Sequence, residues 1–177
     1  SISAEPIYSN ITFTNVGLNA IGVIPETVGV HSVLRVRSMA GYSNISYSLG
    51  GNITVTTGTH FRIEPGVVLK FGTGGNGFDL TIDGSLQAVS TPDSTIAFTG
   101  VYDDSRGNPG DTAGDGAATL PAASQWGYIK FGPTSDDLAS IIQRCDLAFA
   151  GYGYPAVADA AIWCNSASPT IRDNHFS

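Results

Sequence analysis

The sequence predicts an all-β chain folded as a parallel β-helix, a solenoid in which three short strands make each turn. Apolar and polar residues alternate over short runs, which is typical of half-buried strands rather than helices. Gly or Pro interrupts these runs at short intervals and marks sharp corners. Similar phrases also recur about twenty residues apart, a period in the range of solenoid turns. Stacked turns of this kind would bury a common apolar interior.

The alternating pattern begins near Ile53 and continues to the end of the chain. The predicted strands lie within residues 53–57, 60–66, 67–71, 78–84, 85–89, 94–100, 126–132, 140–149, 160–165 and 169–177. One segment, 135–144, has a possible helical start, because Ser135 can cap a turn that opens with two aspartates. The β-branched pair Ile141 and Ile142 indicates that any such helix ends quickly and becomes a strand.

The repeated phrases distinguish a solenoid from a series of hairpins. Residues 61–71 read FRIEPGVVLKF and residues 80–89 read LTIDGSLQAV, so both place an acid and a glycine after an apolar-x-Ile unit. Paired Asn-Gly or Asp-Gly turns between strands of equal length, the usual hairpin signal, do not recur. A jelly-roll β-sandwich is the alternative fold, since its composition is similar.

These phrases resemble bacterial extracellular proteins with right-handed parallel β-helix, pectate-lyase-like repeats. The similarity covers Gly51 to the end and depends on IEPGVVLKF (63–71), QWGYIKF (125–131) and SPTIRDNHF (168–176). The resemblance implies a right-handed coil. Residues 1–50 match poorly, so we expect them to form an irregular N-terminal β cap, which solenoids need to cover an end turn.

Residues 51–177 are therefore predicted to be β-helix coils. The chain stops at TIRDNHFS (170–177), in the middle of a predicted turn. We expect either a longer natural chain or an open end that meets another chain, because unpaired strand edges favour association. Other copies of the protein, or neighbouring coils of a longer chain, are the predicted partners, and cell-surface glycans are a further candidate.

Charge and composition exclude some function classes. The formal net charge is −7 at pH 7 and only 13% of the residues are charged. A nucleic-acid partner would need a basic patch, and an anionic membrane surface would be repelled. Surfaces rich in Ser, Thr, Asn and Gly are common in extracellular β-proteins, so we predict an extracellular or cell-surface location.

The two cysteines leave the redox state open. Cys145 and Cys164 are either bridged or packed as two small apolar side chains. Asn10, Asn44 and Asn52 each begin a glycosylation acceptor pattern, whose use the sequence does not decide.

An Asp- and Gly-rich segment, 103–119, interrupts the strands and is the strongest candidate site. DTAGDG (111–116) follows part of a calcium-loop pattern, with Asp111 and Asp115 at its first and fifth positions and Ala113 in place of a third ligand. Asp103 and Asp104 lie just before it. Ca²⁺ takes six to eight hard oxygen ligands, so we predict that these four aspartates hold a structural Ca²⁺. The alternative is a solvated turn.

Aromatic residues in the second half are candidates for sugar stacking. Trp126, Tyr152 and Tyr154 are the predicted carbohydrate-binding residues, because flat rings bury area at low entropic cost. They are equally suited to filling the corners of a coil. GTGGNG (72–77) matches a dinucleotide pattern, but a strand and not a helix is expected after it, so no cofactor-binding residue is assigned.

No catalytic residue is assigned either. The three histidines share no motif, and we find no nucleophile elbow or zinc signature in the sequence. The sequence therefore favours a non-enzymatic extracellular scaffold or adhesion protein, braced by calcium and self-associating. The alternative is a polysaccharide-active enzyme or a carbohydrate-binding module on the same fold.

Overall fold

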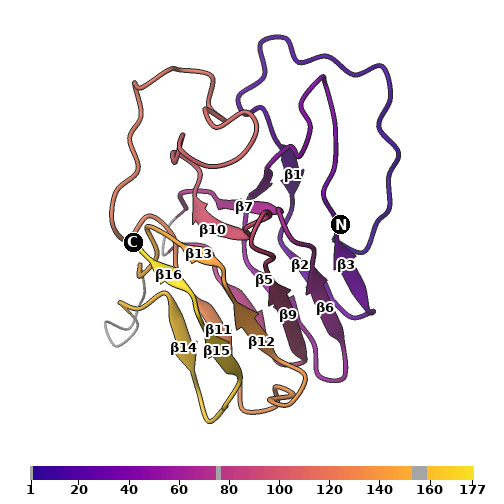
Figure 1. The fold of residues 1–177 in the computed structure, drawn as a ribbon, viewed down its shortest axis with the longest axis vertical. Helices are drawn as coiled ribbons and strands as arrows, with labels where there is room; N and C mark the ends of the chain where they lie inside the picture. Colours follow the sequence, from indigo (N-terminus) through magenta and orange to yellow (C-terminus); the bar gives the residue numbers. More distant parts are fainter. Residues whose placement is uncertain (1, 75–76, 153–158) are drawn as a thin grey trace.

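Parallel strands wind through the chain as a solenoid of about five turns, in agreement with the predicted all-β fold (Figure 1). The computed structural model describes residues 2–74, 77–152 and 159–177. Within these ranges every strand pairs in parallel with the equivalent strand of a neighbouring turn. The described residues contain no helix, and thus none long and apolar enough to cross a bilayer.

Three sheets form the walls. The first, sheet A, contains β1 (Ile21–Val23), β4 (Tyr47–Leu49), β7 (Val68–Phe71), β10 (Ala97–Gly100), β13 (Asp146–Leu147) and β16 (His175–Phe176). Sheet B contains β2 (Glu26–Val28), β5 (Ile53–Val55), β8 (Leu80–Ile82), β11 (Ile129–Phe131) and β14 (Ile162–Cys164). Sheet C contains β3 (Ser32–Leu34), β6 (His60–Ile63), β9 (Ser85–Val89), β12 (Ile141–Gln143) and β15 (Thr170–Arg172). The chain visits A, B and C in that order in every turn.

The interior consists of stacked apolar residues in register. On sheet B, Ile53 lies beside Leu80, which lies beside Ile129, and all three are fully buried or nearly so. Phe61 of sheet C lies beside Leu86 in the same way. Successive side chains of a strand point to opposite faces, so every second residue points inward. Because successive turns are in register, these inward side chains stack into one continuous core.

The ladders begin upstream of the region in which the sequence pattern is clear. β1 to β4 lie within residues 1–50 and pair in parallel with the turns that follow. Residues 2–8 run near this first turn, and the buried Ile2 belongs to the main apolar cluster. The Ile2 N–H donates to the Glu26 carboxylate.

Two local expectations are resolved by the structure. The segment after Ser135 is a turn, in which the Asp136 carboxylate accepts the Ala139 N–H at 3.1 Å, and the chain then enters β12, so the helix start is wrong. Cys145 is buried and Cys164 is exposed, and the two are not bridged. Cys145 therefore serves as a small core residue.

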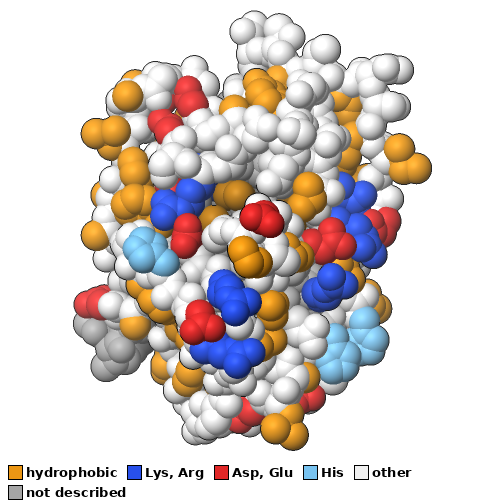
Figure 2. Space-filling model, viewed as in Figure 1, with side chains coloured by type: hydrophobic (Ala, Val, Ile, Leu, Met, Phe, Trp, Pro, Cys, Tyr) orange, Lys and Arg blue, Asp and Glu red, His pale blue; other side chains and the backbone are white. Residues whose placement is uncertain are grey.

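The outer face of sheet C carries charges of both signs. Figure 2 shows Lys and Arg, Asp and Glu, and His side chains interspersed on the face that displays β6, β9 and β12. Arg35 illustrates the pattern, because it pairs with Glu64 of the next turn at 2.8 Å. This face therefore carries charges of mixed sign and no field of a single sign.

Candidate metal centre

A long insertion, residues 101–125, connects β10 of sheet A to β11 of sheet B and lies over the outer side of sheet A (Figure 1). It is pinned at several points. The Thr112 carbonyl accepts the Asn19 N–H at 2.7 Å, and the Asn108 amide donates to the Ser43 carbonyl at 2.6 Å. These contacts fold the insertion back against the first turns of the solenoid.

Lys70 is the deepest anchor of the insertion. It occupies the outer side of β7, in register with Ser48 and Thr99, yet its side chain is fully buried because the insertion covers it. The Nζ atom donates to the carbonyls of Asp103 at 2.8 Å and Gly110 at 2.5 Å. Burial lowers the pKa of Lys70 to about 8, although the nearby carboxylates of Asp103, Asp104 and Asp111 favour its charged form.

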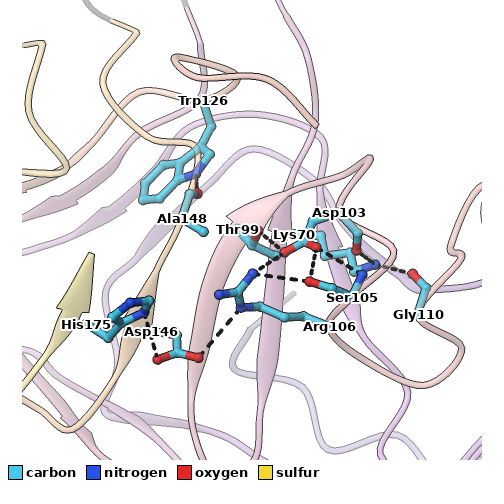
Figure 3. A network of polar contacts seen from close by, with 10 residues as sticks. All are labelled: Lys70, Thr99, Asp103, Ser105, Arg106, Gly110, Trp126, Asp146, Ala148 and His175. Atoms are coloured by element: carbon cyan, nitrogen blue, oxygen red, sulfur yellow. Dashed lines mark hydrogen bonds and ion pairs between the residues drawn. The ribbon is translucent and has the colours of Figure 1, made fainter. Parts of the chain in front are cut away.

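Asp103 is buried and serves the insertion itself (Figure 3). One carboxylate oxygen accepts the Thr99 hydroxyl at 2.6 Å and the Arg106 guanidinium at 2.8 Å. The other accepts the N–H and the hydroxyl of Ser105. Burial acts to raise the pKa of Asp103, but these hydrogen bonds together hold it below its ordinary value. Both oxygens are thus engaged within the protein, and Asp103 is not part of the cluster that the other three aspartates form.

The remaining three predicted ligands converge. One carboxylate oxygen from each of Asp104, Asp111 and Asp115 lies within 4.8 Å of the others. Asp104 is partly buried, and its Oδ1 atom is buried without a hydrogen-bond partner among the described residues. Burial raises the pKa of Asp104, and the Asp111 carboxylate raises it further. A cation placed among these oxygens would favour the ionised carboxylates and so lower the pKa of Asp104.

Backbone amides shape the Asp111 end of this centre. The Asp111 carboxylate accepts the N–H groups of Gly114 at 2.6 Å, Asp115 at 3.2 Å and Gly116 at 2.8 Å. The Gly116 N–H is the main reason that the pKa of Asp111 is lowered. Gly114 and Gly116 have φ values of +69° and +72°, a conformation that other residues rarely adopt. The glycines therefore allow the turn that aims Asp111 toward Asp104.

The three predicted sugar-stacking residues have different positions. Trp126 is fully buried, stacks on Phe71 at 4.1 Å and donates its indole N–H to the Ala148 carbonyl at 2.7 Å. It offers no exposed ring face, so its assignment as a stacking platform is corrected: it is a core residue at the end of the insertion. Tyr152 is 44% exposed. Tyr154 lies outside the described residues.

A second polar group, on the outer side of sheet B, was missed by the sequence patterns. Lys130 and Trp163 are register partners in successive turns, and the Lys130 ammonium lies 4.6 Å from the centre of the Trp163 ring. Tyr128 packs edge-on against the same indole. Asp79 accepts the Tyr128 N–H at 3.2 Å. Burial raises the pKa of both Asp79 and Tyr128. Aligning the sequences of successive turns in register would have placed Lys130 beside Trp163, so this was the signal that could have found the pair.

His31 and His60 also come together, although they share no sequence motif. Their ring centroids are 4.6 Å apart with the ring planes tilted by 32°, and the His31 Nδ1 atom accepts the His60 N–H at 3.0 Å. The contact joins equivalent corners of two successive turns, since Ser32 and Phe61, which follow the two histidines, are register partners.

Comparisons with known proteins find no matching family model, no matching curated protein and no matching solved structure. The class that the geometry defines is a parallel β-solenoid protein with one long insertion that carries a convergent aspartate centre. Its function must be inferred from the solenoid and this centre.

Proposed function

We propose that the chain is a non-enzymatic extracellular or cell-surface scaffold, used as a structural or adhesion module, in which Ca²⁺ braces the insertion. The observation that carries this proposal is the convergence of Asp104, Asp111 and Asp115 on an insertion pinned to a continuous solenoid wall. A wall in which every described strand pairs with a neighbouring turn suits a stiff spacer. An ion that links both ends of the 104–115 segment would extend that stiffness to the largest loop.

The donor set fits calcium. Three carboxylates are hard oxygen ligands, and Asp104 Oδ1 is a buried acceptor that nothing in the described chain satisfies. The Gly-rich turn can add backbone carbonyls, and water can complete the six to eight ligands that Ca²⁺ prefers. When bound, the ion would supply charge that offsets the mutual repulsion of the three aspartates. Asp104, Asp111 and Asp115 would hold it.

Calcium is expected to bind and to stabilise the protein. At a concentration about 100-fold above its dissociation constant it would add about 2.7 kcal/mol, which corresponds to a rise in Tm of roughly 5–10 °C for a chain of this size. Asp111→Asn and Asp115→Asn should each remove most of the binding heat and of the Tm rise. Calorimetric titration and thermal unfolding with and without Ca²⁺ measure both quantities.

Asp136→Asn is the matched control, because Asp136 also accepts a backbone N–H within a turn but lies outside the centre. It should retain the full heat and the full Tm rise. Absence of heat and of any Tm change in the unsubstituted protein would refute the calcium assignment. Retention of both in the double variant Asp111→Asn/Asp115→Asn would do the same.

The proposed location and partners have separate support. The low share of charged residues and the phrases that resemble pectate-lyase-like bacterial extracellular proteins favour secretion and a right-handed coil. The last turn leaves Ile171 and Phe176 exposed, at 38% and 50%. We propose that other copies of the protein cover these two side chains, since exposed apolar strand edges favour association.

A glycan-active role is the second candidate, and the group on sheet B favours it. Trp163 with Lys130, beside Asp79 and Tyr128 of raised pKa, combines an aromatic face with titratable groups. Under the scaffold proposal, incubation with pectin-like polymers should release no unsaturated or reducing sugar. Sugar release that Asp79→Asn abolishes, while Asp136→Asn leaves it unchanged, would establish the second candidate instead.

A further inference from the structure

A polar cleft of about 390 Å³ lies on the outer side of sheet A, at its corner with sheet C, and we name it the corner cleft. Its floor includes Val68 and Ala97, register partners whose side chains stand outside the solenoid core, and Asp146, the register partner of Ala97 on the next turn. Arg106 of the insertion and Asp93 of the preceding corner also line it. This volume is within the range of small-ligand sites.

The charges of the corner cleft are fixed by a chain of contacts that starts in the interior. Buried Asp103 holds the Arg106 guanidinium at 2.8 Å, and Figure 3 shows that guanidinium between Asp103 and Asp146. Arg106 Nε is 3.7 Å from one Asp146 oxygen, and His175 Nδ1 is 3.7 Å from the other. Both distances exceed hydrogen-bond length. No described residue donates a hydrogen bond to the Asp146 carboxylate, which therefore keeps its acceptor capacity.

The formal charge of this group is negative. Arg106 lies within ion-pair distance of both Asp103 and Asp146, and Asp93 adds a third carboxylate, so one positive and three negative formal charges leave −2 when histidine is counted as neutral. The floor between them is aliphatic, and Val68 and Ala97 keep 6% and 4% of their surface exposed. A ligand that complements this arrangement has an aliphatic stem to cover the floor and a cationic end to donate to Asp146. An anionic ligand would be repelled.

We propose that the corner cleft binds a lysine side chain presented by a partner protein. The methylene groups of the lysine would lie over Val68 and Ala97, and its ammonium would donate to Asp146. Arg106 hydrogen-bonds to Asp103 and stays 3.7 Å from Asp146, which leaves Asp146 as the specificity-determining acceptor. This site lies apart from the proposed calcium centre and does not depend on it.

The experiment uses Nα-acetyl-lysine methylamide as the probe and follows backbone amide signals of the whole protein by NMR. Signals of Val68, Ala97 and Asp146 are expected to shift and saturate. Nα-acetyl-norleucine methylamide, which lacks the ammonium, should bind at least about tenfold more weakly, because it cannot make the charge-assisted hydrogen bond. Asp146→Asn should weaken the lysine probe to a similar extent.

Asp136→Asn, a surface acid remote in sequence from the corner cleft, should leave the affinity unchanged, and the Tm of Asp146→Asn should match that of the parent protein. Equal affinity for the lysine and norleucine probes would overturn the proposal. So would unaltered lysine binding by Asp146→Asn. Shifts of the same three amides by galacturonate but not by the lysine probe would replace lysine with a saccharide as the ligand.

Discussion

Trp126→Ala is expected to destabilise the protein by about 3–5 kcal/mol, the range measured when large aromatic residues are removed from cores. Trp126 has no exposed surface and stacks on Phe71 with an interplanar angle of 10°. Its indole also satisfies the Ala148 carbonyl of the next turn. The substitution removes the buried ring, its stacking contact with Phe71 and its hydrogen bond to the Ala148 carbonyl.

The position of Trp126 in the chain makes the effect reach beyond the core. The residue closes the insertion where it returns to sheet B, and the Tyr152 N–H bonds to its carbonyl at 2.9 Å. Loss of the ring should therefore loosen the insertion as well as the stacked interior. Urea unfolding measures the total loss, and hydrogen exchange at residues 101–125 measures the local part.

Trp126→Phe provides the graded comparison and guards against a variant that fails to fold. It keeps an aromatic partner for Phe71 but leaves the Ala148 carbonyl unpaired, so a loss of about 1–3 kcal/mol is expected. Tyr152→Ala, at a half-exposed ring, should cost less than either. A Trp126→Ala loss below that of Tyr152→Ala would contradict the core role of the indole.

The solenoid could be predicted because its signals are local. Phe61 with Ile63 and Leu80 with Ile82 alternate within single strands, and the phrases that contain them recur from turn to turn. The first turn was not visible, because β1 and β2 are three-residue strands in which only Val23 and Val28 are buried. A strand with one buried apolar residue shows too little alternation to separate from loop sequence, whereas the equally short β8 buries two.

The candidate site was predictable in composition but not in detail. Asp103 and Asp104 are adjacent in the sequence but have different roles. Thr99 and Arg106 donate hydrogen bonds to the Asp103 carboxylate, whereas the Asp104 carboxylate lies in the cluster with Asp111. That choice depends on where the insertion docks. The same docking buries Lys70, which the strand pattern places on an outer face. Contacts between an insertion and a distant wall leave no periodic trace in a sequence.

Lys70 gives the second large effect, and it appears as a dependence on pH. The pKa of Lys70 is about 8 in the folded protein and 10.5 in the ordinary state, so the unfolded chain binds the proton more tightly. Below pH 8 both states are protonated and the folded state carries the full cost of a buried ammonium. As pH rises from 8 to 10.5 the folded state loses that proton first, so Lys70 makes folding more favourable by roughly 3 kcal/mol.

Other groups titrate in the same range with the opposite sign. Burial raises the pKa values of Tyr47 and Tyr128, so the folded state holds their protons longer and loses relative stability as the pH rises past 10. The Lys70 contribution must therefore be read as a difference between two proteins. Lys70→Met keeps most of the side-chain volume and removes the titrating group.

The expected result is a difference in unfolding free energy, parent minus Lys70→Met, that grows by roughly 3 kcal/mol between pH 8 and pH 10.5. At pH 7 this difference should be smaller than at pH 10.5, because the parent protein then carries the cost of a buried ammonium that methionine avoids. Methionine in turn leaves the carbonyls of Asp103 and Gly110 unpaired, which destabilises the variant at every pH. Arg62→Met, which removes an exposed cation, should give a difference that is flat over this range. A flat difference for Lys70→Met as well would mean that the ammonium is solvated, and hence that the insertion does not close over sheet A.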